Sequence, residues 1–232
     1  MKAIFKREML SYFTSPIGYV FIGVFMLLSG SGFRGSFLVA KSGNVGQILA
    51  ESMAVLVLLV PIITMRLLAE EKNNKTDQLL LTAPVKVKDI VLGKFMAAFT
   101  VFFMALLTTI PHILIAAIWG NIVISETITA YLGYILIGSL LIAIGLFISA
   151  LTESQVVAAV ITYGVIMALF YLVSINTGIY VIDKVIDCIS IMNYSNTFYL
   201  GIVSFSHVFY YLSGIFLLLF LTVRKVESRR WR

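Results

Sequence analysis

Charged residues and cysteines are scarce in this chain, and both scarcities limit the class of protein it can be. Only 12% of the 232 residues are charged, whereas 60% are hydrophobic and the mean hydropathy is +1.03. A soluble domain normally has about 25% charged residues, so lipid must solvate most of this chain. The single cysteine, Cys188, excludes an intrachain disulfide, and no Cys/His spacing suits a zinc site.

The apolar runs also lack the chemistry of an enzyme or of an ion-coupled carrier. Such proteins keep ionisable groups at membrane depth, and paired carboxylates are absent from the middle of these runs. The sequence has no HExxH helix, no GxSxG elbow and no G-x-x-x-x-G-K-[ST] phosphate loop. We therefore expect no catalytic residue, metal or cofactor in this chain. His112, beside Pro111, is best explained by a hydrogen bond from its neutral imidazole to a neighbouring helix.

Six apolar stretches are each long enough to cross a bilayer, which takes roughly 20 residues in a helix. They cover residues 17–37, 48–68, 91–119, 128–151, 156–173 and 207–223. Pro61 and Pro111 lie inside two of them and predict kinks, which neighbouring helices can satisfy. The first stretch is alternatively a cleaved signal peptide, because small residues follow its apolar run, and cleavage would leave five spans. The sequence thus predicts an all-α polytopic membrane protein with one transmembrane domain over residues 1–232.

Lysine and arginine are distributed unequally between the connections of these spans. Fourteen of the 17 lie in the N-terminus, in the loop after the second span and in the C-terminus, and three lie on the opposite side. By the positive-inside rule, both termini and the charged loop are expected in the cytoplasm, with the chain in the cytoplasmic (inner) membrane. This topology requires an even number of spans. Because the basic residues do not form one patch, the net charge of +6 does not indicate nucleic-acid binding.

Residues 1–15, which precede the first span, predict an interfacial helix. Apolar side chains are spaced for one face of this helix: Ile4, Phe5, Met9, Tyr12 and Phe13. The charged side chains of another face belong to Lys6, Arg7 and Glu8. A helix of this kind lies in the headgroup layer with its apolar face toward the acyl chains. The alternative is a disordered basic tail.

Eight of the chain's 28 charged residues gather in the 20 positions of "EEKNNKTDQLLLTAPVKVKD", residues 70–89. Asn74 can cap a short helix with Asp77 at its third position, and Pro84 can stop that helix. The segment therefore predicts a short helix that carries a knob of three leucines framed by charges. Periodicity alone equally allows a surface loop whose leucines dip into lipid.

The wider segment "RLLAEEKNNKTDQLLLTAPVKVKDIVLGK", residues 66–94, resembles the signature of ABC-2-type permeases, the membrane subunits of a large class of ABC transporters. In that family an acidic pair and basic residues precede a threonine and a leucine-rich "LLLT-x-P" run. The N-terminal "FKREMLSYFTSPIGYVF" (5–21) resembles more narrowly the permease of the gliding-motility-associated ABC transporter. Weaker matches are "SALTES" (149–154) and "LGIVSFSHVFYYL" (200–212).

The resemblance implies six spans, an N-terminal interfacial helix and a coupling helix within residues 70–90 that sits in a groove of a separate ATPase. ATP and magnesium would then belong to that partner and not to this chain. The expected coupling residues are Glu70, Glu71, Lys72, Thr76, Leu79, Leu80, Leu81 and Pro84. Residues 174–206 are expected to be extracytoplasmic and to re-enter the membrane, because they are too apolar for a free loop and too interrupted for a span.

The function that the resemblance implies is that of the permease subunit of an ATP-driven exporter. Its partners would be ABC ATPase subunits, a second identical or similar permease chain and, in a gliding-motility-like assembly, an auxiliary membrane protein with an extracytoplasmic domain. Spans two and five commonly face the dimer axis in the family, which suggests pathway-lining candidates: Glu51, Ser52, Thr64, Thr162 and Tyr163. Each is alternatively a polar group satisfied between helices. The alternative function is that of a scaffold or regulatory subunit that transports nothing.

Overall fold

The computed structural model describes residues 1–35, 45–76, 85–119, 123–172, 184, 186 and 190–230. Nearly all of these residues are helical and none of them forms a strand, so the all-α prediction is confirmed. The longer helices are α2 (Pro16–Phe33), α3 (Val45–Thr64), α6 (Val87–Leu107), α8 (Ile124–Leu151), α9 (Gln155–Tyr171) and α12 (Phe205–Arg230). The shorter ones are α1 (Lys2–Thr14), α4 (Arg66–Asn73), α7 (Ile110–Trp119) and α11 (Ile191–Tyr199).

Within the described ranges, five helical segments are long and apolar enough to cross a membrane. They are Pro16–Phe33, Ile48–Asn73, Val87–Ile118, Ile124–Leu151 and Phe205–Arg229. The predicted 156–173 span coincides with α9, which is apolar but only 17 residues long. The chain is therefore a helical, multi-pass membrane protein. Of the two predicted kinks, Pro61 lies inside α3, one turn before its end, and Pro111 lies at the break where α6 gives way to α7.

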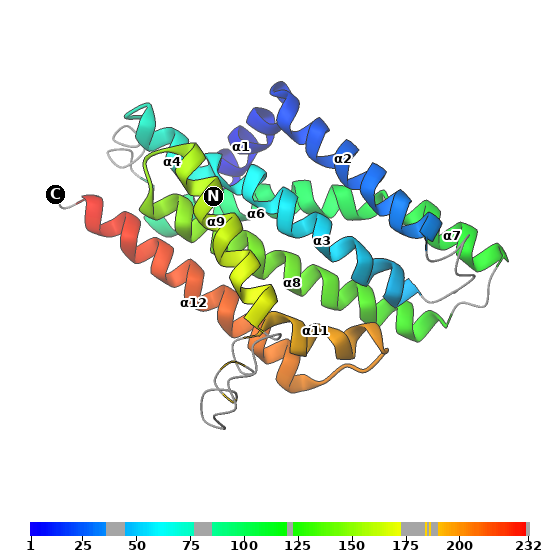
Figure 1. Cartoon of the computed structure of the whole chain (residues 1–232). Helices are drawn as coiled ribbons and strands as arrows, with labels where there is room; N and C mark the ends of the chain where they lie inside the picture. The colour runs from blue at the N-terminus through cyan, green and yellow to red at the C-terminus, as the bar shows by residue number, and fades with distance from the viewer. Residues whose placement is uncertain are drawn as a thin grey trace.

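Helix α8 lies at the centre of the bundle and contacts α3, α4, α6, α9, α11 and α12 (Figure 1). Two of its glycines allow neighbours to approach closely. A Cβ atom at Gly138 would lie 2.3 Å from Cζ of Phe102 on α6, and one at Gly145 would lie 2.2 Å from Oγ1 of Thr64 on α3. Without a hydrophobic force between helices in lipid, such small residues supply the close packing that holds a bundle together.

Several segments that are distant in sequence meet at one end of the bundle (Figure 1). Helix α4 contacts the end of α8, where Lys72 Nζ lies 3.1 Å from the carbonyl oxygen of Thr152. Near the C-terminal end of α12, Arg229 Nη2 lies 3.5 Å from Oε1 of Glu153 in the turn between α8 and α9. Helix α1 reaches α4 through an ion pair between Arg7 and Glu71. We call this end of the molecule the polar end.

Candidate functional site

The polar frame of the predicted coupling segment lies on α4, at the polar end. Glu70, Glu71 and Lys72 occupy the last two turns of this helix, and Thr76 lies exposed just beyond it. Asn74 stands at the C-cap of α4, where its amide bonds to the Glu70 carbonyl at 3.0 Å, so it ends this helix, whereas we expected it to begin a new one. The other coupling candidates, Leu79, Leu80, Leu81 and Pro84, lie outside the described residues, as does Asp77.

Glu71 belongs to a four-residue ion cluster, formed by Arg7, Glu8, Glu71 and Lys94, that joins three helices. The ammonium of Lys94 on α6 lies 2.9 Å from Glu8 Oε1 on α1 and 2.9 Å from Glu71 Oε1 on α4. Arg7 pairs with Glu8 at 2.6 Å and also with Glu71. Only 1% of the Lys94 side chain is exposed, against 12% and 14% for the two carboxylates. Two cations thus face two anions, and the cluster has no net formal charge.

The charges of this cluster stabilise one another against the cost of burial. Burial by itself would raise the pKa of Glu8, but the nearby Lys94 ammonium and Arg7 guanidinium outweigh it and hold the pKa below the usual 4.5. A carboxyl with a lowered pKa in the folded state contributes stability above its unfolded pKa, and loses it as the pH falls through the folded value. The contribution of Glu8 is therefore complete at neutral pH and is lost only in acid below about 4.5.

Arg66, at the start of α4, forms an ion pair within that helix and a hydrogen bond to the link between α1 and α2. Arg66 forms a two-pronged pair with Glu70, with Nε to Oε2 at 2.6 Å and Nη2 to Oε1 at 3.1 Å, and its Nη1 donates to Ser15 Oγ at 3.2 Å. Close by, the buried hydroxyl of Tyr12 on α1 donates to the carbonyl of Ile63 at 2.6 Å. Tyr12 of α1 and Ser15 just after it are thus hydrogen-bonded to the two sides of the α3–α4 joint.

The joint between α3 and α4 also holds a side chain of α8. The buried hydroxyl of Ser149 accepts hydrogen bonds from the amides of Leu68, at 3.1 Å, and Ala69, at 3.0 Å, and it donates to the Met65 carbonyl at 3.2 Å. In return, Lys72 donates to the carbonyls of Ser149, Ala150 and Thr152, at the C-terminal end of α8. Amides at a helix start and carbonyls at a helix end lack partners within their own helix, so each helix satisfies groups of the other. We call these contacts the α4–α8 junction.

The comparison with protein families identifies the chain. The model of the ABC-2 family transporter proteins matches residues 3–223, nearly the whole length. The chain belongs to the ABC-2 transporter family. It is therefore a permease, a membrane component for transport and not itself a catalytic enzyme, and permeases of this family generally work with ABC ATPase partners. A search among curated proteins gave no match.

The pathway-lining candidates of this ABC-2 permease do not converge on one place in the single chain. Ser52 and Thr64 are buried on α3, where Ser52 Oγ donates to the Leu49 carbonyl at 2.7 Å and Thr64 Oγ1 donates to that of Val60 at 2.9 Å. Thr162 on α9 is buried, and among the described residues its hydroxyl has no hydrogen-bond partner. Glu51 and Tyr163 are exposed. Their role in transport stays a prediction.

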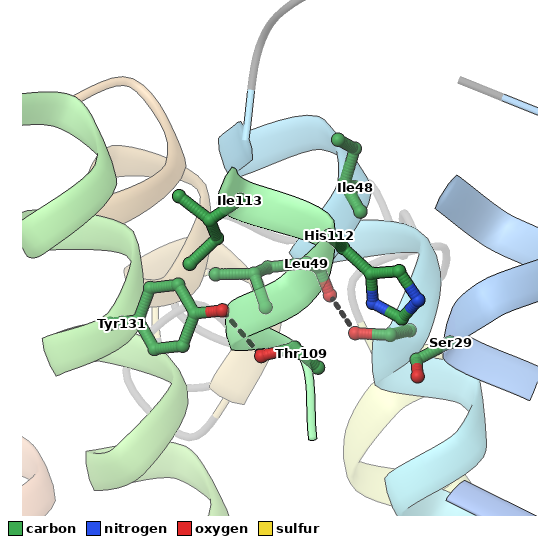
Figure 2. A pocket seen from close by; sticks show the side chains of 8 residues that line it. Ser29, Ile48, Leu49, Thr109, His112, Ile113 and Tyr131 are labelled. Atoms are coloured by element: carbon green, nitrogen blue, oxygen red, sulfur yellow. Dashed lines mark hydrogen bonds between the residues drawn. The ribbon is translucent and has the colours of Figure 1, made fainter. Parts of the chain in front are cut away.

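A small pocket lies between α2, α3, α7 and α8 of the permease (Figure 2). It is lined by Ser29, Ile48, Leu49, Ser52, Thr109, His112, Ile113 and Tyr131. The hydroxyls of Thr109 and Tyr131 bond to each other across it. His112 was expected to donate a hydrogen bond to a neighbouring helix. Within the described part of the chain it instead stacks on Phe33 of α2, with the ring centres 5.0 Å apart. Of the five polar side chains of the pocket, four carry a hydroxyl group and the fifth is the imidazole of His112.

Sequence reasoning missed Glu8, Lys94 and Ser149 as parts of the polar end. Lys94 carried a usable signal, since it is a charged residue inside the predicted 91–119 span, and a charge in such a run needs a partner. Ser149 was noticed only within the weak "SALTES" match. Nothing local to these residues indicates that Ser149 bonds to Leu68 or that Lys94 pairs with Glu8, each more than 75 positions away along the chain.

Proposed function

We propose that this permease moves a substrate across the cytoplasmic membrane, as an exporter, with ATP that a separate ATPase subunit hydrolyses. The ATPase docks on the coupling segment, residues 70–84, with Leu79, Leu80 and Leu81 as its packed knob. The observation that carries the proposal is the fixed placement of α4. This helix contributes Glu70, Glu71 and Lys72 to the segment. Glu70 is held by Arg66 of the same helix, Glu71 by side chains of α1 and α6, and Lys72 by carbonyls at the end of α8. A force applied at the segment therefore reaches three other helices, α1, α6 and α8.

Six membrane crossings, with α9 as the fifth, fit the arrangement of the polar end. The turn after α8 and the end of α12 share an ion pair between Glu153 and Arg229. The chain leaves that turn with α9 and returns to it at the end of α12, which supports one crossing by each of these helices. The 17 residues of α9 span about 26 Å at about 1.5 Å per residue, close to the bilayer's apolar thickness of about 30 Å. Both termini and the coupling segment would then face the cytoplasm, as the basic residues suggest.

The remaining parts of the proposal rest on the family resemblance. Helix α1 lies in the headgroup layer beside the bundle, and the segment 174–206 re-enters the membrane. Its described helix, α11, has only nine residues and packs on α8 and α12, where the Tyr211 hydroxyl donates to the Ile191 carbonyl at 3.0 Å. Two such chains, identical or similar, form the transporter with two ATPase chains. The similarity of residues 5–21 favours the gliding-motility-associated subfamily, with an auxiliary membrane protein as a further partner.

Co-purification with the ATPase encoded beside this chain tests the proposal. Replacing Leu80→Asp puts a charge into the packed knob, so we expect the affinity for the ATPase to fall by about thirtyfold or more, the effect of losing an interface hot spot of about 2 kcal/mol. ATP-driven transport in proteoliposomes should fall with it. The matched control is Leu80→Met, which keeps an apolar side chain of similar size in the knob and should change neither.

Two outcomes would contradict this account in different ways. If Leu80→Asp leaves both association and transport intact, the coupling assignment is wrong. If the ATPase binds the wild-type chain but ATP drives no transport in any proteoliposome preparation, the chain is the scaffold or regulatory subunit that we considered as the alternative.

A further inference from the structure

Lys94 is the most deeply buried charged residue in the described part of the chain, and the ATPase-docking hypothesis does not account for it. It lies on the second turn of α6, outside the coupling segment, and its two carboxylate partners come from two other helices. A buried ammonium is costly unless it is paired and hydrogen-bonded. The pairing of this one with both Glu8 and Glu71 means that the position of α6 depends on α1 and α4 together.

Two of the helices that the ion cluster joins, α4 and α6, flank the coupling segment in the chain. Helix α4 comes directly before residues 77–84 and helix α6 follows them, so the two helices carry any displacement of the coupling segment into the bundle. The Lys94–Glu71 pair joins these two helices at that point, and the Lys94–Glu8 pair adds α1. A second contact binds α1 to α6, because a Cβ atom at Gly93 would lie only 3.2 Å from Cβ of Ile4.

We propose that Lys94 is a positioning residue that joins α1, α4 and α6 into one rigid unit, so that the ATPase moves the three helices together when it displaces the coupling segment. The inference rests on the proposed function and assigns to it a residue outside the docking segment. The ion cluster is neutral and closed, and separating any of the three helices would leave a buried charge without its partner. The low-cost motion is therefore one in which the cluster stays intact.

Two variants separate positioning from simple charge compensation. Lys94→Met leaves the carboxylates in excess, whereas Lys94→Met with Glu8→Gln restores neutrality through the remaining Arg7–Glu71 pair but does not restore the tie to α6. If Lys94 positions the helices, both variants should bind the ATPase as the wild type does, while ATP-driven transport falls by about tenfold or more, since breaking a buried ion pair is strongly unfavourable. Recovery of wild-type transport in the double variant would overturn the proposal, because charge balance alone would then suffice.

A disulfide tests the rigid unit without removing the cluster. The test variant is Ile4→Cys with Gly93→Cys in a Cys188→Ser background. Its two Cβ atoms would lie 3.2 Å apart, close to the Cβ separation of about 3.5–4.5 Å found in disulfides. Oxidation should leave ATP-driven transport by the reconstituted complex within about twofold of the reduced protein, because α1 and α6 do not separate during the cycle. Loss of transport on oxidation, restored by a reductant, would overturn the rigid unit. Failure of the reduced protein and the wild type to bind the ATPase at all would instead contradict the proposed function.

Discussion

Replacing Gly145→Leu is expected to prevent α3 and α8 from packing. Even the Cβ atom of the new side chain would lie 2.2 Å from Oγ1 of Thr64, which is itself fully buried. Overpacking a close helix contact costs about 1–3 kcal/mol and often more, and here the obstacle includes a β-branched side chain on the neighbouring helix. We expect a melting temperature in detergent at least several degrees below that of the wild type, or failure to accumulate as a folded monomer.

The control for this prediction is Gly164→Leu on α9. A Cβ atom there would meet nothing within 4 Å, so the folded single chain should keep its melting temperature. Equal stability of the Gly145 and Gly164 variants would show that α3 and α8 are not in the close contact described above.

Replacing Ser149→Ala is expected to open the α4–α8 junction. The hydroxyl is the acceptor for the buried amides of Leu68 and Ala69, and a buried donor without its partner costs about 1–3 kcal/mol. Loss of both bonds should speed hydrogen exchange at these two amides by at least about tenfold, because they then depend on a weakened helix start. Because α4 leads into the coupling segment, transport by the assembled complex should fall as well.

Ser139→Ala supplies the matched control on the same helix. The Ser139 hydroxyl donates only within α8, to the carbonyl of Ile135 at 2.6 Å, so its loss should leave exchange at Leu68 and Ala69 unchanged. If Ser149→Ala behaves like this control, Ser149 does not hold the start of α4.

The helices were predictable from the sequence because each apolar run is long, and hydropathy alone determines where such a run can lie. The ends of the helices were less predictable. The second predicted span stops at Leu68, whereas helical structure continues to Asn73. The continuation depends on Ser149 and Lys72, which join α4 to α8 from positions far apart in the sequence. A local pattern carries no information on such a contact.

The candidate site was predictable only in part for the same reason. The charges of Glu70, Glu71 and Lys72 stand out in so apolar a chain, and they do lie together on one helix. Glu70 takes a partner four residues away on α4, but the partners of Glu71 and Lys72 are decided by the packing of α1, α6 and α8 around that helix. The pathway candidates differ from these charges because they need no partner on another helix. A serine or threonine in a membrane helix can bond to its own backbone, as Ser52 and Thr64 do.

The sidedness of the coupling segment is the claim on which the whole account depends, and it can be measured by labelling cysteines in a Cys188→Ser background. Thr76→Cys, at an exposed position just beyond α4, and Val123→Cys, at the exposed start of α8, are treated with a membrane-impermeant maleimide. In intact cells the account predicts labelling at position 123 and none at position 76, with position 76 reacting once the membrane is permeabilised. Labelling at position 76 in intact cells would place the segment outside, where no ATPase could reach it.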